Sequence, residues 1–245
     1  MCRHLAYVGP PASLQSVLVD PPYGLYRQSW ASRRQQYGTV NADGFGVGWY
    51  SGGDPVPARY RRALPIWADE SFADVARVTR TGALLAAVRS ASAGTEHGAR
   101  SVAPFAGDGW LFSHNGRIEG WPDAAEPVAA TLPAAALLAL EARVDSALLW
   151  ALVLHRLRAG LGPADALADT IAALAAAGVK GRFNFLLTDG RRIAATAAGD
   201  TLCYKITGES HIVASEPCDD EPGWQDVPDG TVIDICEGRI ASAIH

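Results

Sequence analysis

The order of the predicted elements constrains the fold of this chain more than any single motif does. Strand patterns dominate the first half of the sequence, two helical patterns follow, and the last third returns to strands. The final strands form two pairs, 183–188 with 192–197 and 231–236 with 239–244. Asp189-Gly190 and Glu237-Gly238 lie in the turns between them, and an acidic residue followed by glycine is typical of a β-hairpin turn. This order predicts an α+β fold in which helices pack outside antiparallel sheets.

Hydrophobic periodicity and end signals place the remaining elements. Strands are expected before the helical region at about residues 2–8, 44–50, 84–90 and 110–113. Helices are expected at about residues 13–18, 70–80, 146–157 and 163–178. Asp145 is expected at the N-cap position of the third helix. Alternating glycines in the strand 44–50 predict that another backbone segment approaches it closely.

Composition and charge limit the class of protein. The chain has 245 residues, 49% hydrophobic and 19% charged, so we expect one domain over residues 1–245, or 2–245 once Met1 is removed. A formal net charge of −5 offers no basic surface for nucleic acid. Charged residues or proline interrupt the apolar runs and no signal peptide is apparent, so no membrane partner is expected. The sequence indicates no particular oligomeric state.

The cysteine spacing argues against a metal site. Four cysteines lie far apart, at positions 2, 203, 218 and 236. They form no CxxC pair and no zinc-binding spacing with histidine, so we expect neither a metal nor another cofactor. A reducing cytoplasm is the simplest compartment for such a chain.

Cys2 has the most distinctive chemistry in the sequence. Removal of Met1, which is usual before a small residue, would leave a thiol and a free α-amine on the same Cα. An unperturbed α-amine titrates near pH ~8 and a thiol near ~8.5, so the amine can act as the base for its own side chain. This is the arrangement of an N-terminal nucleophile. The alternative is an incidental buried cysteine.

Three further clusters carry polar groups next to predicted elements. Arg89 ends an apolar strand, where a guanidinium suits a carboxylate ligand or a structural ion pair. Asn115 and Gly116 end another strand, where they fit either an oxyanion hole or an ordinary turn. Asp145 begins a helix, where it fits either a functional carboxylate or an ordinary N-cap.

The joint order of these motifs resembles the class II glutamine amidotransferases. The stretches that carry the resemblance are Met1-Cys2, NADGFGVGW at 41–49, AVRSAS at 87–92, FSHNG at 112–116, VDS at 144–146 and ASEP at 214–217. They span essentially the whole chain, and their combination is specific although each motif alone is weak. The resemblance implies a four-layer αββα sandwich of the N-terminal nucleophile hydrolase type.

The resemblance also implies a role for each motif. Cys2 would be the nucleophile and its α-amine the general base. Asn115 and the N–H of Gly116 would bind the oxyanion. Arg89 would hold the α-carboxylate of a γ-glutamyl substrate, and Asp145 its α-ammonium. Ser90 and His114, which lie in the same motifs, are expected among the substrate-binding residues.

Two positions depart from the family pattern. The stretch 101–105 (SVAPF) stands where many members have Asn-x-x-Pro, so polar help from that loop is expected to be lost. Ala147 stands where many members have an acidic residue after the helix-capping aspartate. Both changes indicate a specialised substrate rather than free glutamine.

Other stretches are similar to one branch of the family. Residues 20–24, 33–38, 85–91 and 214–220 resemble the actinobacterial γ-glutamyl amidohydrolases of ergothioneine biosynthesis, which remove glutamate from γ-glutamyl-hercynylcysteine sulfoxide. The chain ends where such a domain ends, which favours a stand-alone hydrolase. Two alternatives remain: a glutaminase subunit that supplies ammonia to a separate synthetase, and a γ-glutamyl-binding module without catalysis. Hydrolysis of glutamine alone would favour the first, and retention of Met1 the second.

Overall fold

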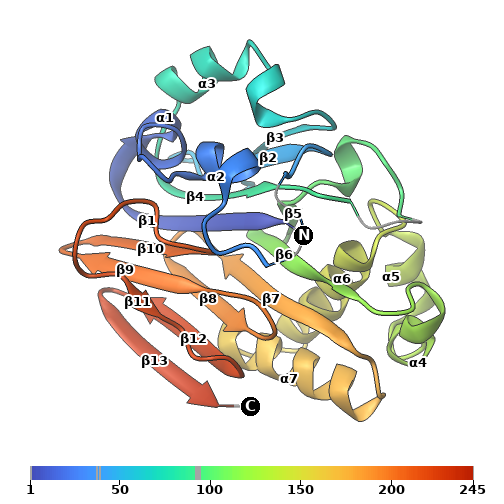
Figure 1. The fold of residues 1–245 in the computed structure, drawn as a ribbon. Coiled ribbons are helices and arrows are strands. Elements are labelled where there is room, and N and C mark those ends of the chain that lie inside the picture. The colour runs from blue at the N-terminus through green and yellow to red at the C-terminus, as the bar shows by residue number, and fades with distance from the viewer. Residues whose placement is uncertain (1, 37, 39, 92–94, 245) are drawn as a thin grey trace.

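Two antiparallel sheets face each other in the computed structural model, which describes residues 2–36, 38, 40–91 and 95–244 (Figure 1). Met1 and Ser92, which belong to two of the motifs, lie outside the described residues. The first sheet runs in the order β11 (Gln225–Asp226), β9 (Cys203–Thr207), β10 (Ser210–Ala214), β1 (Arg3–Ser13), β4 (Arg80–Val88), β2 (Phe45–Trp49) and β3 (Ala58–Arg62). The second runs in the order β13 (Arg239–Ile244), β12 (Thr231–Cys236), β8 (Arg192–Ala197), β7 (Gly181–Thr188), β6 (Trp110–Ile118) and β5 (Phe105–Gly107).

Helices cover the outer face of each sheet (Figure 1). The first sheet is covered by α1 (Leu14–Leu18), α2 (Leu25–Ala31) and α3 (Phe72–Val78). The second is covered by α6 (Asp145–Arg158) and α7 (Pro163–Ala176), with the short helices α4 (Glu126–Ala129) and α5 (Ala134–Leu138) beside them. No helix in the described part of the chain has the length and apolar character needed to cross a membrane.

Three apolar clusters correspond to the three interfaces between these layers. Leu84 packs toward the first helical layer, whereas its neighbour Leu85 packs between the sheets, as the alternation of a strand requires. On β6, Leu111 faces the opposite sheet and Phe112 faces the helices. Fully burying one such side chain contributes about 1.5–3 kcal/mol. The predicted α+β, αββα sandwich is therefore confirmed.

The element predictions were correct in type and less accurate at their ends. Ser13 caps α1 as predicted, and its hydroxyl accepts the N–H of Ser16 at 3.0 Å. The prediction that Asp145 is an N-cap was wrong by one position, because Val144 is the capping residue and Asp145 is the first helical residue. The prediction that 113–116 ends a strand was also wrong, because β6 continues to Ile118 in register with β7. Strands β3, β5, β9, β10 and β11 and helices α2, α4 and α5 were not predicted.

The glycines of β2 confirm the predicted close approach of a second backbone segment. A Cβ atom on Gly46 would lie 2.2 Å from the carbonyl oxygen of Ala103. Only glycine leaves room for that segment, which leads from the loop after β4 into β5 and so forms one wall of the site described next.

Candidate active site

The fold places Cys2 beside the end of β4. Arg3 pairs with Val88 across β1 and β4, which brings Cys2 next to Arg89 and Ser90. The Cys2 thiol points toward the carbonyl oxygen of Ser90, with 4.0 Å between Sγ and O. The half-buried thiol lines a cavity of about 20 Å³, whose polar lining also includes Arg89, Ser101, His114 and Ser146. This volume is enough for about one water molecule, so a γ-glutamyl group needs more room than this cavity now offers.

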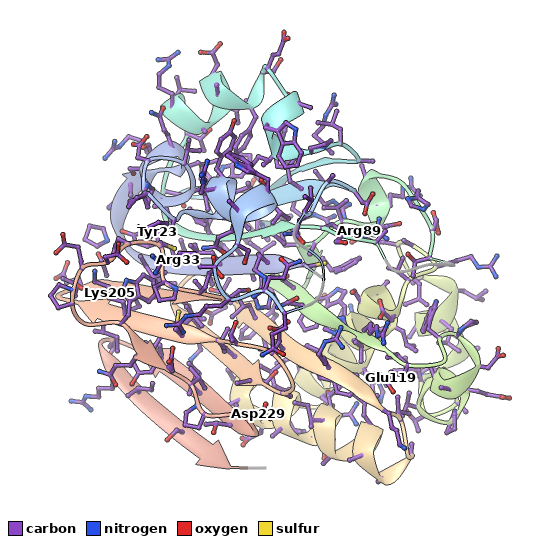
Figure 2. The ribbon with its side chains drawn as sticks, viewed as in Figure 1. Tyr23, Arg33, Arg89, Glu119, Lys205 and Asp229 are labelled. Atoms are coloured by element: carbon purple, nitrogen blue, oxygen red, sulfur yellow. The ribbon has the colours of Figure 1, made fainter. Side chains whose placement is uncertain are left out.

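Arg89 offers an unused hydrogen-bond donor at this cavity. Its side chain is buried, and Nη2 donates to Thr95 Oγ1 at 3.2 Å and to the carbonyl oxygen of Glu96 at 3.0 Å. Nη1 is buried and has no hydrogen-bond partner among the described residues. An unsatisfied guanidinium donor in a buried cavity is costly unless an anion or water meets it. Figure 2 shows Arg89 on the same side of the molecule as Glu119, away from Tyr23 and Lys205.

Asp43, which lies in the glycine-rich motif, holds the backbone around Arg89. Its N–H donates to the carbonyl oxygen of Arg89 at 2.9 Å, and its carboxylate accepts the N–H of Ala91 at 2.7 Å. The N–H of Arg89 donates to Gly44 O at 2.8 Å. These bonds fix the strand end that carries Arg89, and the sequence analysis did not assign Asp43 this role.

The loop before β5 contributes a polar group that the sequence analysis discounted. Ser101 is only 3% exposed, lines the cavity with Cys2, and has a hydroxyl without a partner among the described residues. The prediction that polar help from this loop is lost was therefore wrong. Ser101 is the last residue of the 3-10 turn Ala99–Ser101, and its side chain lines the cavity.

His114 links β6 to the start of α6. Its Nε2 lies 2.8 Å from the carbonyl oxygen of Arg182, which can only accept, so Nε2 carries the proton. Its Nδ1 then accepts from the Ser146 hydroxyl at 3.0 Å. Burial lowers the pKa of His114, and the nearby Asp145 carboxylate raises it by less. The net shift is downward and favours the neutral ring. Both ring nitrogens are thus occupied within the protein.

Asp145 faces a second cavity, of about 340 Å³, that is also lined by Thr95, Arg117, Glu119 and Trp121. Its Oδ1 accepts the N–H of Ser146 at 2.7 Å, and its Oδ2 accepts the N–H of Ile118 at 3.0 Å. A carboxylate has about four acceptor positions, so Asp145 can still receive an ammonium group.

Asn115 and Gly116 lie side by side within β6. Asn115 is fully buried, and its Nδ2 donates to Asp200 Oδ2 at 3.4 Å. Gly116 lies so close to β7 that a Cβ atom there would be 1.9 Å from Arg182 O. Asp200, which bonds to Asn115, and Arg3, which pairs with Asp200, lie outside the recognised motifs and were missed by the sequence analysis. They are separated by 197 residues, and no local pattern connects them.

The other cysteines lie in different surroundings. Burial raises the pKa of the Cys203 thiol far above its ordinary value and that of Cys218 to about 12. Both therefore remain protonated at neutral pH and are poor nucleophiles. Cys236 ends β12, outside the cavity with Arg89. Cys2, which lines that cavity, is therefore the better candidate.

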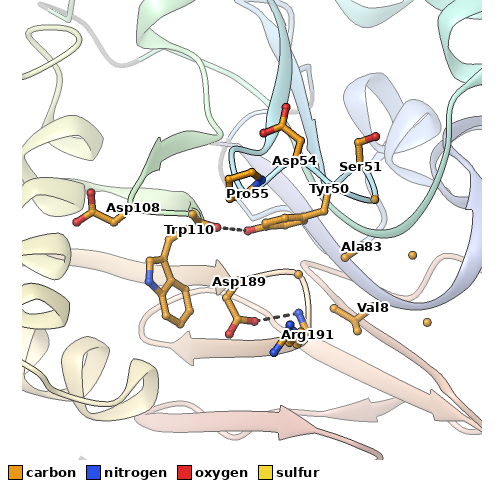
Figure 3. A pocket seen from close by; sticks show the side chains of 15 residues that line it. Val8, Tyr50, Ser51, Asp54, Pro55, Ala83, Asp108, Trp110, Asp189 and Arg191 are labelled. Atoms are coloured by element: carbon orange, nitrogen blue, oxygen red, sulfur yellow. Dashed lines mark hydrogen bonds between the residues drawn. The ribbon is translucent and has the colours of Figure 1, made fainter.

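A larger cavity of about 760 Å³ lies away from Cys2, next to Tyr50 and Trp110 (Figure 3). Its buried polar side-chain atoms all have partners. The Tyr50 hydroxyl donates to Gly109 O at 2.9 Å, and the Asp189 carboxylate accepts the N–H of Arg191 at 2.9 Å. This cavity therefore offers no unsatisfied group comparable to Arg89 Nη1.

Comparison with known proteins points to one family. The family model described as glutamine amidotransferases class-II matches residues 17–211. The γ-glutamyl-hercynylcysteine sulfoxide hydrolase of Mycolicibacterium smegmatis is 41% identical over 240 residues, which cover 98% of each chain. The protein of the same name from Mycobacterium tuberculosis (strain CDC 1551 / Oshkosh) is 41% identical over 97% of this chain and 94% of that one.

Solved structures agree on the fold. A class II glutamine aminotransferase domain protein from Silicibacter pomeroyi superimposes with a TM-score of 0.72 at 24% identity and covers 99% of both chains. The phosphoribosylpyrophosphate amidotransferase of Bacillus subtilis gives a TM-score of 0.71 at 16% identity, over 99% of this chain and 49% of that one. The motifs, the family match and the identity to full-length relatives agree, and the chain belongs to the class II glutamine amidotransferase family.

Proposed function

We propose that this chain hydrolyses a γ-glutamyl amide, with γ-glutamyl-hercynylcysteine sulfoxide as its substrate and glutamate and hercynylcysteine sulfoxide as products. The observation that carries the proposal is that Cys2 and the unsatisfied Nη1 of Arg89 line one buried cavity. A nucleophile beside a guanidinium with one unused nitrogen suits an amide that carries a carboxylate. Similarity over nearly the full length to hydrolases of that name supports the choice of substrate.

The reaction would begin once Met1 has been removed. The α-amine of Cys2 takes the proton of its own thiol, and the sulfur attacks the γ-carbonyl carbon. Asn115 Nδ2 and the Gly116 N–H stabilise the resulting oxyanion. The ammonium form of the Cys2 amine returns the proton to the leaving nitrogen, and the C–N bond breaks to leave a glutamyl thioester. Water, deprotonated by the same amine, then hydrolyses the thioester and releases glutamate.

Recognition would come from groups around this centre. Arg89 Nη1 meets the α-carboxylate, with the Ser90 segment beside it. Asp145 receives the α-ammonium through its free acceptor positions. His114 would hold the neighbouring site residues in place and not bind substrate directly, because its two ring nitrogens already bond to Ser146 on α6 and to Arg182.

We further infer a cytoplasmic, single-domain enzyme with a small-molecule substrate and without a nucleic-acid or membrane partner. A catalytic thiol must stay reduced, which the cytoplasm provides. The family model spans most of the chain, which supports the single domain.

Hydrolysis of two substrates by the purified protein tests the proposal. γ-Glutamyl-hercynylcysteine sulfoxide and free glutamine are incubated separately, and released glutamate is measured. We expect a clearly higher kcat/KM for the sulfoxide. Hydrolysis of glutamine alone would identify the chain as a glutaminase and overturn the proposal.

A further inference from the structure

We propose that Asp200 is a positioning residue that orients the side-chain amide of Asn115 for catalysis and is itself held by Arg3. The inference rests on the proposed function, because it takes Asn115 as the donor to the oxyanion. It adds a part of the machinery that lies outside the recognised motifs, in the loop between β8 and β9.

Asp200 is a buried carboxylate with defined partners. Its side chain is 2% exposed and that of Arg3 is fully buried, and Arg3 Nη2 lies 3.4 Å from Asp200 Oδ2. Oδ1 accepts the N–H of Thr201 at 2.8 Å. A carboxylate this deep is costly unless it is paired and hydrogen-bonded. Arg3 supplies the charge and Thr201 a fixed donor, so the carboxylate has one orientation.

Asp200 can select the orientation of the Asn115 amide. Asn115 Nδ2 lies 3.4 Å from Asp200 Oδ2. An ionised carboxylate only accepts, so it favours the rotamer that presents NH₂ and disfavours the flipped rotamer that presents Oδ1. The second proton of Nδ2 remains available for the oxyanion. A flipped amide would instead direct a partly negative oxygen at the developing negative charge.

The backbone of Asp200 is held next to Asn115 by the neighbouring strand. Asn184 on β7 lies directly opposite Asn115 on β6. Asn184 Nδ2 donates to the carbonyl oxygen of Asp200 at 2.8 Å, and its Oδ1 accepts the N–H of Asp200 at 3.1 Å. The loop is therefore pinned to the strand pair that carries the oxyanion donor.

Arg3 makes the network relevant to the nucleophile as well. It is the residue after Cys2, so its bond to Asp200 ties the start of β1 to the strand that carries Asn115. The start of β1 lies next to β6 in Figure 1, and His4 Nδ1 lies 3.1 Å from Ser113 Oγ. Arg3 also balances the charge of Asp200, which would otherwise repel an oxyanion held by Asn115.

The test is the Asp200→Asn variant, which keeps the side-chain size and loses the acceptor-only character. We expect kcat for the γ-glutamyl substrate to fall roughly ten- to a hundredfold, which is less than the roughly hundred- to thousandfold loss typical of removing an oxyanion donor outright. Substrate Kd, measured in the Cys2→Ala background, should change by less than about twofold. Asp234→Asn is the control for loss of a paired carboxylate, because Asp234 lies 3.4 Å from Arg192 in a partly exposed pair outside the site.

A double-mutant cycle with Asn115→Ala separates positioning from general support of the fold. If Asp200 acts through Asn115, Asp200→Asn has little further effect on kcat once Asn115 is alanine. Equal losses in both backgrounds, or an unchanged kcat in the single variant, would overturn the proposal. If Asp200→Asn does not fold because Arg3 is left unpaired, the Arg3→Gln/Asp200→Asn double variant removes both charges together. Its effect on kcat is then compared in the wild-type and Asn115→Ala backgrounds in the same way.

A spectroscopic readout distinguishes failure of this inference from failure of the proposed function. The side-chain NH₂ signals of Asn115, assigned by their loss in Asn115→Ala, should be distinct and slow to exchange with solvent in the wild type. They should broaden or merge in Asp200→Asn. Unchanged signals would overturn the positioning role even in an active enzyme, whereas a wild type inactive on γ-glutamyl amides would overturn the proposed function.

Discussion

At the scale of the residue, the site is defined by polar groups that lack partners. Arg89 Nη1, Ser101 Oγ and Asn115 Oδ1 are buried, and none has a hydrogen bond among the described residues. Most buried polar atoms in folded proteins are bonded, so Arg89 Nη1 and Ser101 Oγ, whose residues line the cavity with Cys2, point to a ligand or water that completes them. Motif reading found two of the three, and it missed Ser101 because a serine there departs from the family pattern.

We predict that Arg89→Lys raises KM strongly or abolishes activity. Lysine keeps the charge but loses the planar fork that meets a carboxylate through two N–H groups. The measurement is kcat and KM for the γ-glutamyl substrate and for its analogue amidated at the α-carboxylate. The wild type should use the amidated analogue poorly, and the variant should discriminate less. Equal use of both substrates by the wild type would show that Arg89 does not bind that carboxylate.

We predict that Asn115→Ala and Asp145→Asn fail in different ways. Loss of one oxyanion donor typically lowers kcat by roughly a hundred- to a thousandfold, or about 3–4 kcal/mol, with a smaller change in Kd. Asp145→Asn should mainly weaken binding, because it removes the charge that meets the substrate ammonium. Rates and affinities are compared after melting curves confirm folding. An unchanged kcat with weakened binding in Asn115→Ala would make Asn115 a binding residue instead.

At the scale of the element, β6 carries predicted site residues on both of its faces. Ser113 and Asn115 share the face of Leu111 between the sheets, while His114 and Gly116 share the face of Phe112 toward the helices. The sequence predicts a strand end here because Asn-Gly is typical of turns. Pairing with β7 overrides that local preference, and such tertiary pairing cannot be read from a short motif.

We predict that Gly116→Ala destabilises the protein and impairs catalysis together. Its Cβ would lie 1.9 Å from Arg182 O and 2.5 Å from His114 Nε2, so the β6–β7 pair must separate. Overpacking of this kind costs about 1–3 kcal/mol or more, equivalent to a fall in Tm of at least about 2–4 °C. Gly52→Ala is the control, because a Cβ atom there meets nothing within 4 Å. Equal Tm values for the two variants would contradict the close approach.

At the scale of the whole molecule, the sequence predicts layers better than connections. The hairpins β7–β8 and β12–β13 and the amphipathic helices follow from local periodicity, and the structure confirms them. The hairpin of β9 and β10 was missed because it alternates weakly, and it is held in place by pairing of β10 with β1. The family resemblance identified the site residues, whereas the Arg3–Asp200 pair depends on the complete fold.

We predict that the free energy of unfolding falls as pH drops below about 6.5, the ordinary histidine pKa. Burial, with help from Arg3 and His114, lowers the pKa of His4 well below that value, and burial also lowers the pKa of His114. At such pH values these histidines are protonated in the unfolded state but neutral in the folded state. Each one changes the free energy of unfolding by up to about 1.4 kcal/mol per pH unit between its folded-state and unfolded-state pKa values. The stability is fully present above pH ~6.5.

Melting temperatures measured from pH 8 to pH 5 check this prediction. His4→Gln removes one of these buried groups and should show a shallower decline than the wild type. His155→Gln is the control, since His155 is exposed. Parallel curves for the wild type and His4→Gln would contradict a role for burial of His4.

The most direct test of the account is mass spectrometry of the intact protein, quenched in acid during turnover of γ-glutamyl-hercynylcysteine sulfoxide. The account predicts a chain without Met1 that carries one glutamyl group, mapped by digestion to Cys2. The adduct should persist in Cys218→Ser, and Cys2→Ala should still bind substrate but form neither adduct nor product. Turnover by a chain that retains Met1, or substantial hydrolysis by Cys2→Ala, would contradict the central claim that the processed Cys2 is the nucleophile.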